Sequence, residues 1–518
     1  MTTKPLPIGL QTFRKIIEGG YLYVDKTRLL YEIIQHESGI YFLSRPRRFG
    51  KSLLLSTLDE IFQGNRELFK GLWLYDSPYN WQKHPVIRFD FSLIRAETAE
   101  EVQRGIVWQI KMQARQHNIT LMGENYLEMF SDLIYQLAAE RQVVILVDEY
   151  DKPMLDQIEN AGVATAIRDA LKSFYTIIKG MDAYVRFVLL TGVSKFSRVG
   201  VFSGLNNLND LTMDNAYATL LGVTQNELET YFAEYLQAFA DTHQIAPAEL
   251  RQQIRLWYNG FCFSSRCETV YNPFSLLLLF QKQKFQNYWF ESGTPTFLLK
   301  LLKDRHYDLQ TLQELEIPEL AFSTYEIESL EIVPLLVQSG YLTIQGYDPA
   351  SRRYRLGYPN YEVEHAFLAY LLGTYGAIEK ATATNLLGHL VTALQAANWT
   401  RFFTVLNSLL ASISYELHIS QERYYQSIFY LIFKLIGLEI HAEVRTNQGR
   451  IDAVIQTAQA VYIFEFKLDD SAQAALDQIH SRAYFAPYLA ATKPIHLLGI
   501  RFDVAHGSIT EWLAQQRN

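Results

Sequence analysis

IYFLSRPRRFGKSLLLSTLDEIF, residues 40–62, contains three structural signals in a row. A short apolar run leads into a basic loop, and the loop leads into a stretch with helical periodicity. The loop ends in Gly50, Lys51 and Ser52, the second half of the pattern G-x-x-x-x-G-K-[ST], with Arg45 at the position of the first glycine. Gly50 lets backbone N–H groups approach a phosphate, Lys51 can reach its oxygens, and Ser52 can ligate Mg²⁺. We therefore expect a nucleotide site; the alternative is a basic surface loop, because GK[ST] alone is common.

A second apolar run delivers two carboxylates to the expected sheet. VVILVDE, residues 143–149, places Asp148 and Glu149 at the carboxyl end of a buried strand, where α/β sheets bind their ligands. Asp148 would hold Mg²⁺ through water or through Ser52, and Glu149 would activate the attacking water. An acidic helix cap is an adequate alternative for one carboxylate, but it explains less well why a pair follows a phosphate loop. We expect the chain to bind and hydrolyse a nucleotide.

Residues 1–215 alternate β-branched runs with helical stretches, which is the pattern of a parallel sheet wrapped by helices. A strand expected at 184–190 is followed by Thr191 and Ser194, whose polar side chains could contact the γ-phosphate. Four short, mostly apolar strands are expected at 40–44, 85–91, 143–147 and 184–190. The expected nucleotide contacts are Arg47, Arg48, Phe49, Gly50, Lys51, Ser52, Asp148, Thr191 and Ser194. Arg45 belongs to the same basic cluster, for which we expect triphosphate to be the partner.

Two alternating segments near the C-terminus predict a β-hairpin. GRIDAVIQ, residues 449–456, and VYIFEFK, residues 461–467, both show the period of two that a strand requires. If the residues between them form a short loop, Asp452 lies directly across from Glu465. Like charges opposed in this way are destabilising, and a divalent metal is the simplest means of relieving them. Because side chains alternate along a strand, Glu465 and Lys467 share a face, so Lys467 lies beside the acidic pair.

An Asp that faces Glu-x-Lys is suited to phosphodiester cleavage. Asp452 and Glu465 would hold Mg²⁺, which polarises the phosphate and lowers the pKa of its bound water, and Lys467 would orient that water. A helix that begins near residue 421 should contribute one more carboxylate, Glu422. The pattern alone is weak, because a Glu and a Lys on a strand usually form a solvated ion pair.

Several long blocks of the sequence are specific enough to indicate a family. They are PIGLQTFRKIIEGGYLYVDKT (7–27), RPRRFGKS (45–52), VDEYDKP (147–153) and LTGVSKFSRVGVFSGLNNLNDLT (190–212), with GRIDAVI and YIFEFKLD near the C-terminus. These blocks resemble bacterial AAA-ATPase-like proteins that carry a C-terminal PD-(D/E)XK nuclease-like domain. In that family the phosphate loop itself lacks the first glycine, so the resemblance makes Arg45 an ordinary residue at its position. It also implies that Gln478 and Tyr484 accompany the nuclease site, whereas Gln426 departs from the His that is common there.

The resemblance implies an α/β multidomain protein with a P-loop ATPase core on a parallel sheet and a restriction-endonuclease-like α/β domain at the C-terminus. A helical lid and a winged-helix-like region should lie between them, and residues 333–364 predict a helix followed by a hairpin. The expected divisions are an AAA-like P-loop ATPase domain at 1–215, a helical lid at 216–300, a winged-helix-like and helical relay at 301–415, and a PD-(D/E)XK nuclease-like domain at 416–518.

We therefore expect an ATPase whose nucleotide state gates Mg²⁺-dependent cleavage of DNA or RNA, with Mn²⁺ as an alternative metal at the nuclease site. A first alternative is a signal-transduction-type ATPase switch whose nuclease-like domain only binds nucleic acid or a partner. A second alternative is an ATPase with a structural tail. A homo-oligomer is compatible with each of these, and both defence against foreign nucleic acid and mobile-element maintenance fit the architecture of the family.

Composition limits the remaining classes. Of the 518 residues 49% are apolar and 20% are charged, which rules out disorder. Apolar runs fall far short of the ~18 residues that cross a bilayer, and the first residues lack the apolar core of a signal peptide, so we expect a cytoplasmic protein without a membrane partner. Two cysteines exclude a disulfide framework.

The net charge of −8 argues against a general attraction for nucleic acid. Within 416–518, however, nine basic residues stand against eleven acidic ones, and three of those acids are assigned to the metal site. We therefore expect nucleic-acid binding that is weak unless a divalent metal is present.

Overall fold

The computed structural model describes most of the chain. The described residues are 3–36, 38–195, 201–202, 205, 207–291, 296–305, 307, 309–313, 315–322, 332–376, 378–411, 422–439, 443–446, 453–468, 470–490, 493–504 and 506–517. The chain divides into two compact units: Met1–Gly293 with Glu314–Glu362, and Thr294–Gln313 with Val363–Asn518. Each unit contains helices packed on its own five-stranded sheet, so the predicted α/β multidomain fold class is confirmed.

The first unit is built on a parallel sheet of five strands. They are β1 (Ile40–Ser44), β2 (Val86–Asp90), β3 (Val143–Asp148), β4 (Val185–Gly192) and β5 (Leu208–Asp210), in the order β2-β3-β4-β1-β5. The four strands expected from the sequence are present, whereas β5 is too short to show a periodicity of its own. The carboxyl ends of β1, β4 and β3 lie side by side at one edge, which is where parallel sheets place their ligand sites.

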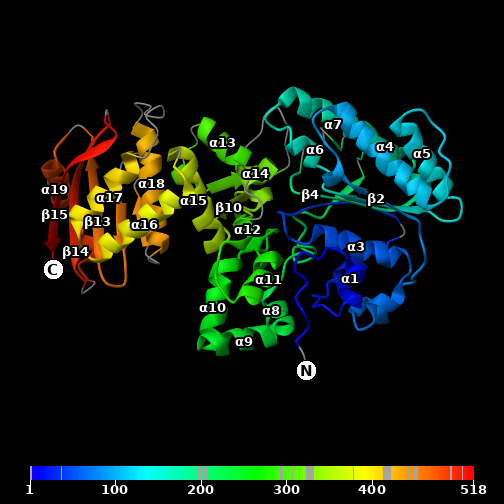
Figure 1. Cartoon of the computed structure of the whole chain (residues 1–518), viewed down its shortest axis with the longest axis horizontal. Coiled ribbons are helices and arrows are strands. Elements are labelled where there is room, and N and C mark those ends of the chain that lie inside the picture. The colour runs from blue at the N-terminus through cyan, green and yellow to red at the C-terminus, as the bar shows by residue number, and fades with distance from the viewer. Residues whose placement is uncertain are drawn as a thin grey trace. The chain divides into compact units, whose positions relative to one another are not determined.

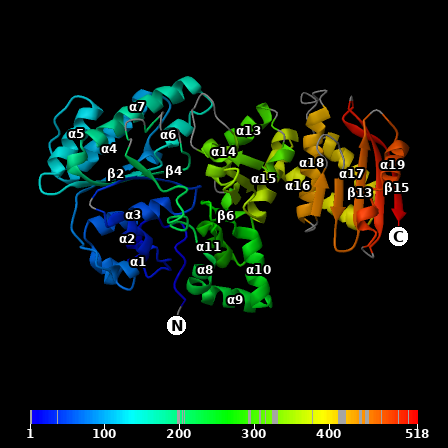
Figure 2. The ribbon, with the colours of Figure 1, turned by 180° about the vertical axis from the view of Figure 1, so that it is seen from behind.

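Helices cover both faces of this sheet (Figures 1 and 2). One face carries α4 (Ala99–Gln116), α5 (Tyr126–Leu137), α6 (Lys152–Leu155) and α7 (Ala161–Gly180), and the other carries α1 (Phe13–Glu18), α2 (Thr27–Ile34) and α3 (Lys51–Phe62). Ile87, Phe89, Phe130, Leu133 and Phe174 are buried in the core between the strands and the first group of helices. Burial of this apolar surface is what holds the helices on the sheet.

The rest of the first unit is helical, with two small antiparallel sheets. Its helices are α8 (Gln225–Tyr231), α9 (Ala233–His243), α10 (Pro247–Tyr258), α11 (Pro273–Lys282), α12 (Tyr288–Glu291) and α14 (Ile332–Ser339). The small sheets pair β6 (Phe261–Cys262) with β7 (Thr269–Val270), and place β8 (Leu315–Pro318), β9 (Thr343–Asp348) and β10 (Arg353–Gly357) in the order β8-β10-β9. Helix α14 with β9 and β10 is the helix and hairpin that the sequence predicts over 333–364.

The second unit contains a mixed five-stranded sheet. Its strands, in spatial order, are β11 (Glu443–Thr446), β12 (Ala453–Gln456), β13 (Val461–Lys467), β14 (Ile495–Asp503) and β15 (Ser508–Arg517); β13 and β14 are parallel and the other neighbours are antiparallel. Its helices are α13 (Thr296–Asp304), α15 (Tyr361–Gly376), α16 (Lys380–Gln395), α17 (Trp399–Ala411), α18 (Glu422–Glu439) and α19 (Ala472–Ser481), and the first two residues of α15 belong to the first unit.

Alternate side chains of β13 pack on opposite faces of this sheet. Val461 and Ile463 join α19 in one apolar cluster. Phe464 and Phe466 face the other way, where Phe464 contacts aromatic rings of α17 and α18 and Phe466 contacts α18. Glu465 and Lys467 therefore project toward the α19 side. In the part of the chain that the structure describes, no helix has the length and apolar character needed to span a membrane.

Candidate functional site

The phosphate loop joins β1 to the N-terminus of α3. Gly50 is the N-cap of α3 and has a φ of +95°, in the left-handed region that favours glycine. A Cβ at this position would meet nothing within 4 Å, so the backbone angle rather than space requires glycine here. Arg48 in the same loop also has a positive φ, of 64°. The loop thus makes a tight turn into the N-terminus of α3, and a helix N-terminus is a favourable place for an anion.

Lys51 lies folded against its own loop. It is 6% exposed, and its Nζ donates hydrogen bonds to the backbone oxygens of Arg45 at 2.9 Å and Pro46 at 3.0 Å. Burial lowers the pKa of Lys51, and Asp148, Asp151 and Glu149 are close enough to raise it in part. The lysine and the carboxylates predicted from the sequence are therefore brought together.

The two carboxylates at the end of β3 differ in their surroundings. Asp148 is 5% exposed and accepts hydrogen bonds from Thr191 Oγ1 at 2.8 Å and from the backbone N of Glu149 at 3.1 Å. Glu149 is half-buried, with a φ of 50° that costs a non-glycine residue roughly 1 kcal/mol. Burial raises the pKa of Glu149, Lys51 opposes the shift, and the neighbouring Asp148 adds to it. Strain of this kind persists where the surrounding structure fixes the residue, which is typical of functional sites.

Asp151 is a site residue that the sequence reasoning missed. It is 1% exposed, and its Oδ2 accepts hydrogen bonds from the backbone N of Ser194 at 2.6 Å, from Ser194 Oγ at 2.7 Å and from the backbone N of Val193 at 3.0 Å. Burial raises the pKa of Asp151, and the bonds from Ser194 lower it in part. Asp151 thus fixes the tip of β4 beside the end of β3. Its position in VDEYDKP was visible, but its partners became evident only in the fold.

The sequence predicts that Arg45 belongs to the basic cluster that binds triphosphate, and this prediction is wrong. Its guanidinium is buried and donates to the backbone oxygens of Thr212 at 2.8 Å and Tyr217 at 3.2 Å. It also lies over the ring of Phe263, 4.2 Å from the centroid. Desolvation lowers the pKa of Arg45. The residue that replaces the first glycine of the loop therefore attaches the segment after β5 to the loop.

The other loop side chains have separate surroundings. Phe49 is buried, with its ring centroid 4.9 Å from that of Phe261. Arg47 and Arg48 have exposed side chains, and the guanidinium of Arg48 lies 5.0 Å from the ring centroid of Phe274. Two charged side chains thus remain accessible at the loop, while Phe49 anchors it.

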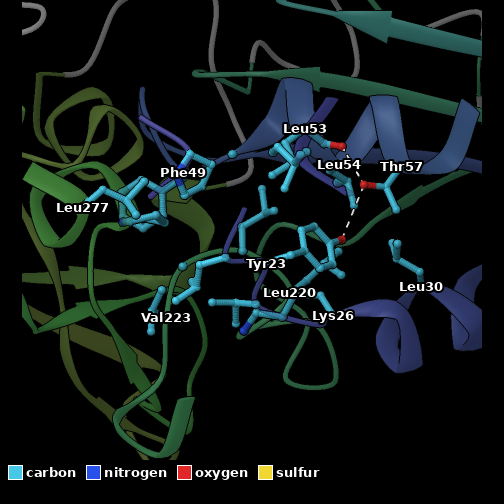
Figure 3. Close-up of a pocket in the computed structure, with 18 of the residues that line it drawn as sticks. Tyr23, Lys26, Leu30, Phe49, Leu53, Leu54, Thr57, Leu220, Val223 and Leu277 are labelled. Carbon is cyan, nitrogen blue, oxygen red and sulfur yellow. Dashed lines mark hydrogen bonds between the residues drawn. The ribbon is translucent and has the colours of Figure 1, made fainter. Parts of the chain in front are cut away.

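A mostly apolar cavity of about 130 Å³ lies beside Gly50 (Figure 3). Its lining comes from the N-terminal segment, from the loop and α3, from the segment that precedes α8, and from α11. The lining includes Tyr23, Lys26, Leu30, Phe49, Leu53, Leu54, Thr57, Leu220, Val223 and Leu277. Tyr23 points toward Thr57, with the two hydroxyl oxygens 3.5 Å apart. Lys26 donates to Glu227 at 2.7 Å. No sequence pattern predicts this cavity, because its lining is assembled from distant segments.

The C-terminal hairpin has the predicted register. Gln456 is opposite Val461 and Ala453 is opposite Phe464. Asp452 lies outside the described residues, so its place across from Glu465 stays a prediction. Glu422 is the first residue of α18, and its side chain also lies outside the description.

Glu465 is the centre of a polar cluster on the α19 side of the sheet. It is 1% exposed and accepts hydrogen bonds from Lys467 Nζ at 3.1 Å and from Gln478 Nε2. Lys467 Nζ also donates to Gln478 Oε1 at 2.6 Å, and Gln478 Nε2 donates to the hydroxyl of Tyr484 at 3.3 Å. Of the residues predicted for this site, the structure brings together Glu465, Lys467, Gln478 and Tyr484.

Gly499 allows this cluster to form. It is the β14 partner of Glu465, and a Cβ there would lie 2.3 Å from the backbone oxygen of Ala472 and 2.8 Å from the backbone N of Leu476. Helix α19 can therefore approach the sheet closely enough for Gln478 to reach Glu465.

Both sites offer oxygen donors of the kind that Mg²⁺ prefers. At the loop these are the hydroxyl of Ser52 and the buried carboxylate of Asp148. At the hairpin the carboxylate of Glu465 is the described donor. Among the described residues no group of three or more His, Cys, Asp or Glu side chains could hold a metal. The further ligands expected at the hairpin, Asp452 and the side chain of Glu422, lie outside the described part of the structure and stay a prediction.

Comparison with known proteins covers both sites. A family model described as a predicted AAA-ATPase matches residues 7–202, and a model of the PD-(D/E)XK nuclease superfamily matches residues 420–512. A protein of Azotobacter chroococcum mcd 1, described as an uncharacterized protein in the vnfD 5' region, is 40% identical over 528 residues, which cover 99% of each chain. The first match contains the phosphate loop and the ends of β3 and β4, and the second contains the hairpin and α19.

Proposed function

Because the chain belongs to the family of AAA-ATPase-like proteins that carry a C-terminal PD-(D/E)XK nuclease domain, we propose that it couples ATP hydrolysis in its first unit to metal-dependent cleavage of nucleic acid in its second. One observation carries the first half of the proposal. Lys51, the carboxylates at the end of β3 and the polar tip of β4 meet at one edge of a parallel sheet, which is where such sheets bind ligands.

In the first unit, the phosphates would lie at the N-terminus of α3. Lys51 would exchange its backbone partners for phosphate oxygens, with Arg47 and Arg48 at the accessible side of the loop. The mostly apolar cavity beside Gly50 suits a flat, weakly polar base. Ser52 and Asp148 would hold Mg²⁺, which when bound neutralises charge on the phosphates, and Thr191 and Ser194 would lie toward the γ-phosphate.

Glu149 would act as the base for the attacking water. Its position at the end of β3 is fixed by the bond between its backbone and Asp148. Burial raises the pKa of Glu149, which brings it closer to the range in which a carboxylate accepts protons effectively near neutral pH.

In the second unit, Asp452, Glu465 and Glu422 would hold Mg²⁺ or Mn²⁺, which when bound lowers the pKa of its water. Lys467 would orient that water or offset charge that develops on the phosphate. Gln478 supports this arrangement because it bonds to both Glu465 and Lys467. The substrate class is DNA or RNA.

The test is a cleavage and ATPase assay on the full chain. Single- and double-stranded DNA and RNA are incubated with Mg²⁺ or Mn²⁺, with and without ATP. We expect Glu149→Gln to lower ATP turnover by roughly a hundredfold or more, as loss of a general base does, while ATP still binds. Glu465→Gln should abolish cleavage and leave ATP turnover in place.

Two exposed acids serve as matched controls: Glu140→Gln in the first unit and Asp477→Asn on α19 should leave both activities unchanged. If the wild-type chain leaves every nucleic acid intact, the nuclease half of the proposal fails. Nucleotide-dependent binding of nucleic acid without cleavage would then favour the second candidate, an ATPase switch.

A further inference from the structure

Trp289 lies between the phosphate loop and a buried carboxylate. Its indole Nε1 donates a hydrogen bond to the backbone oxygen of Arg47 at 2.9 Å, and its backbone N donates to Oε1 of Glu362 at 2.6 Å. Trp289 is 4% exposed and Glu362 is 0% exposed. One residue thus bonds to the loop through its side chain and to Glu362 through its backbone.

Glu362 is held where the first unit ends. Its second carboxylate oxygen accepts a hydrogen bond from Ser275 Oγ at 2.8 Å. Glu362 is the second residue of α15, and from Val363 onward this helix belongs to the second unit. Because breaking a hydrogen bond to a buried carboxylate is costly, Glu362 should follow any movement of Trp289 rather than lose the bond.

The opposite end of this connection lies at the lysine that is expected to bind phosphate. Lys51 donates to the backbone oxygens of Arg45 and Pro46, the two residues before Arg47. A triphosphate competes for Lys51, because a charged oxygen is a stronger acceptor than a carbonyl. The backbone of the loop then loses two hydrogen bonds next to the carbonyl that Trp289 contacts.

We infer that Trp289 and Glu362 transmit the nucleotide state of the phosphate loop to helix α15, and thereby regulate the unit that carries the nuclease domain. This inference rests on the proposed function and names how its nucleotide site regulates the second unit. The two residues supply the physical connection that coupling between distant sites requires. A static role, in which Trp289 fixes α12 to the loop whatever the loop holds, involves the same contacts. The two roles differ only in whether α15 responds to nucleotide.

Hydrogen exchange on the full chain distinguishes these roles. Exchange of amides within 361–376 is measured with and without a saturating non-hydrolysable ATP analogue and Mg²⁺. In the wild type we expect the analogue to change this exchange by about fivefold or more, the lower end of ordinary allosteric coupling. Trp289→Phe keeps an aromatic ring but removes the donor, and Glu362→Gln keeps the shape but removes the charge. Trp289→Phe should lose most of the nucleotide-dependent change, and Glu362→Gln, which keeps one acceptor oxygen but makes its bonds neutral, should lose part of it.

Trp108→Phe is the matched control, because it makes the same substitution at a tryptophan that is 57% exposed on α4. It should respond to the analogue like the wild type. Binding of the analogue is titrated for every variant, so that each comparison is made at saturation.

Three results would overturn the inference. If the wild-type chain binds the analogue without any change of hydrogen exchange in α15, the relay is refuted and the proposed ATP binding still stands. The relay is also refuted if Trp289→Phe and Glu362→Gln change hydrogen exchange by the same amount with and without the analogue, because the response to nucleotide is then unaltered, as a static role predicts. A wild-type chain that fails to bind the analogue refutes the proposed function, and the relay with it.

Discussion

The phosphate loop and the C-terminal hairpin each place one lysine among acidic side chains, but the two lysines are held differently. Lys51 is 6% exposed and bonds to two backbone oxygens of its own loop, with the carboxylates of 148–151 nearby. The side chain of Lys467 is 25% exposed and bonds directly to the carboxylate of Glu465. Lys51 is thus available to a ligand at the loss of two carbonyl bonds, whereas Lys467 balances a charge that the fold has buried.

The surrounding structure differs in the same way. The loop is irregular, and contacts between its own side chains and distant segments fix it: Arg45 bonds to the 212–217 segment and Phe49 packs on Phe261. The hairpin is fixed by the regular pairing of β12 with β13 and by the adjacent α19. We therefore expect the loop to be most sensitive to loss of its distant anchors, and the hairpin to loss of charge balance.

Replacement of Arg45 by glycine should have the largest effect, although it restores the general G-x-x-x-x-G-K-[ST] pattern. We expect Arg45→Gly to lower the free energy of unfolding of the first unit by about 3 kcal/mol, because the partly buried carbonyls of Thr212 and Tyr217 lose their donor and the buried side chain of Arg45 is removed. Urea unfolding followed by tryptophan fluorescence measures it, since five of the seven tryptophans lie in this unit. Arg48→Gly is the control: glycine suits its φ of 64°, so stability should change little. Equal losses in the two variants would contradict the anchoring role of Arg45.

Lys51→Met should separate binding from stability. We expect affinity for ATP to fall roughly a hundredfold, the scale expected when one partner of a buried charged interaction is removed. Stability should hardly change, because burial lowers the pKa of Lys51 and the charged form is thus no more stable in the fold than in water. Isothermal titration and urea unfolding check the two quantities, with Lys152→Met, a partly exposed lysine in an i,i+4 ion pair, as control. A large loss of stability in Lys51→Met would show that the lysine supports the fold itself.

Lys467→Met should show the opposite behaviour. It leaves Glu465, 1% exposed, without this cation, so we expect the opening free energy of β13 to fall by roughly 1–2 kcal/mol. Hydrogen exchange of the β13 amides measures it. The double variant with Glu465→Gln should recover most of the loss, because no buried charge then needs a partner. If the loss is the same in both backgrounds, the two side chains are not coupled.

The same contrast decides how much the sequence could predict. The register of β12 with β13 follows from the period of two and a short loop, and Gln456 opposite Val461 confirms it. The burial of Arg45 could not be predicted, because its acceptors lie more than a hundred residues away and only the fold brings them near. The cavity beside Gly50 and the partners of Asp151 depend on tertiary contacts in the same manner. Local pattern therefore predicts paired strands well, but not the side chains that shape an irregular loop.

The smallest effect is expected at Asp151, where hydrogen bonds rather than a cation hold a carboxylate. Asp151→Asn keeps an acceptor oxygen for Val193 and Ser194 but makes the bonds neutral, which weakens them. Burial raises the pKa of Asp151, so the fold already disfavours its charge, and removing that charge offsets part of the loss. We expect the free energy of unfolding to fall by about 1 kcal/mol in the urea experiment used for Arg45→Gly.

Asp151→Ala is the companion variant, because it removes the acceptor as well as the charge. If hydrogen bonds to the tip of β4 are what matter, it should cost clearly more than Asp151→Asn, since the backbone N–H of Val193 and the buried backbone N–H of Ser194 then lose their partner. Equal losses would mean that the charge of Asp151, and its attraction to Lys51, fixes the turn after β3. In that case the carboxylates at the end of β3 would depend on charge balance just as Glu465 does. The contrast between the two sites would then disappear.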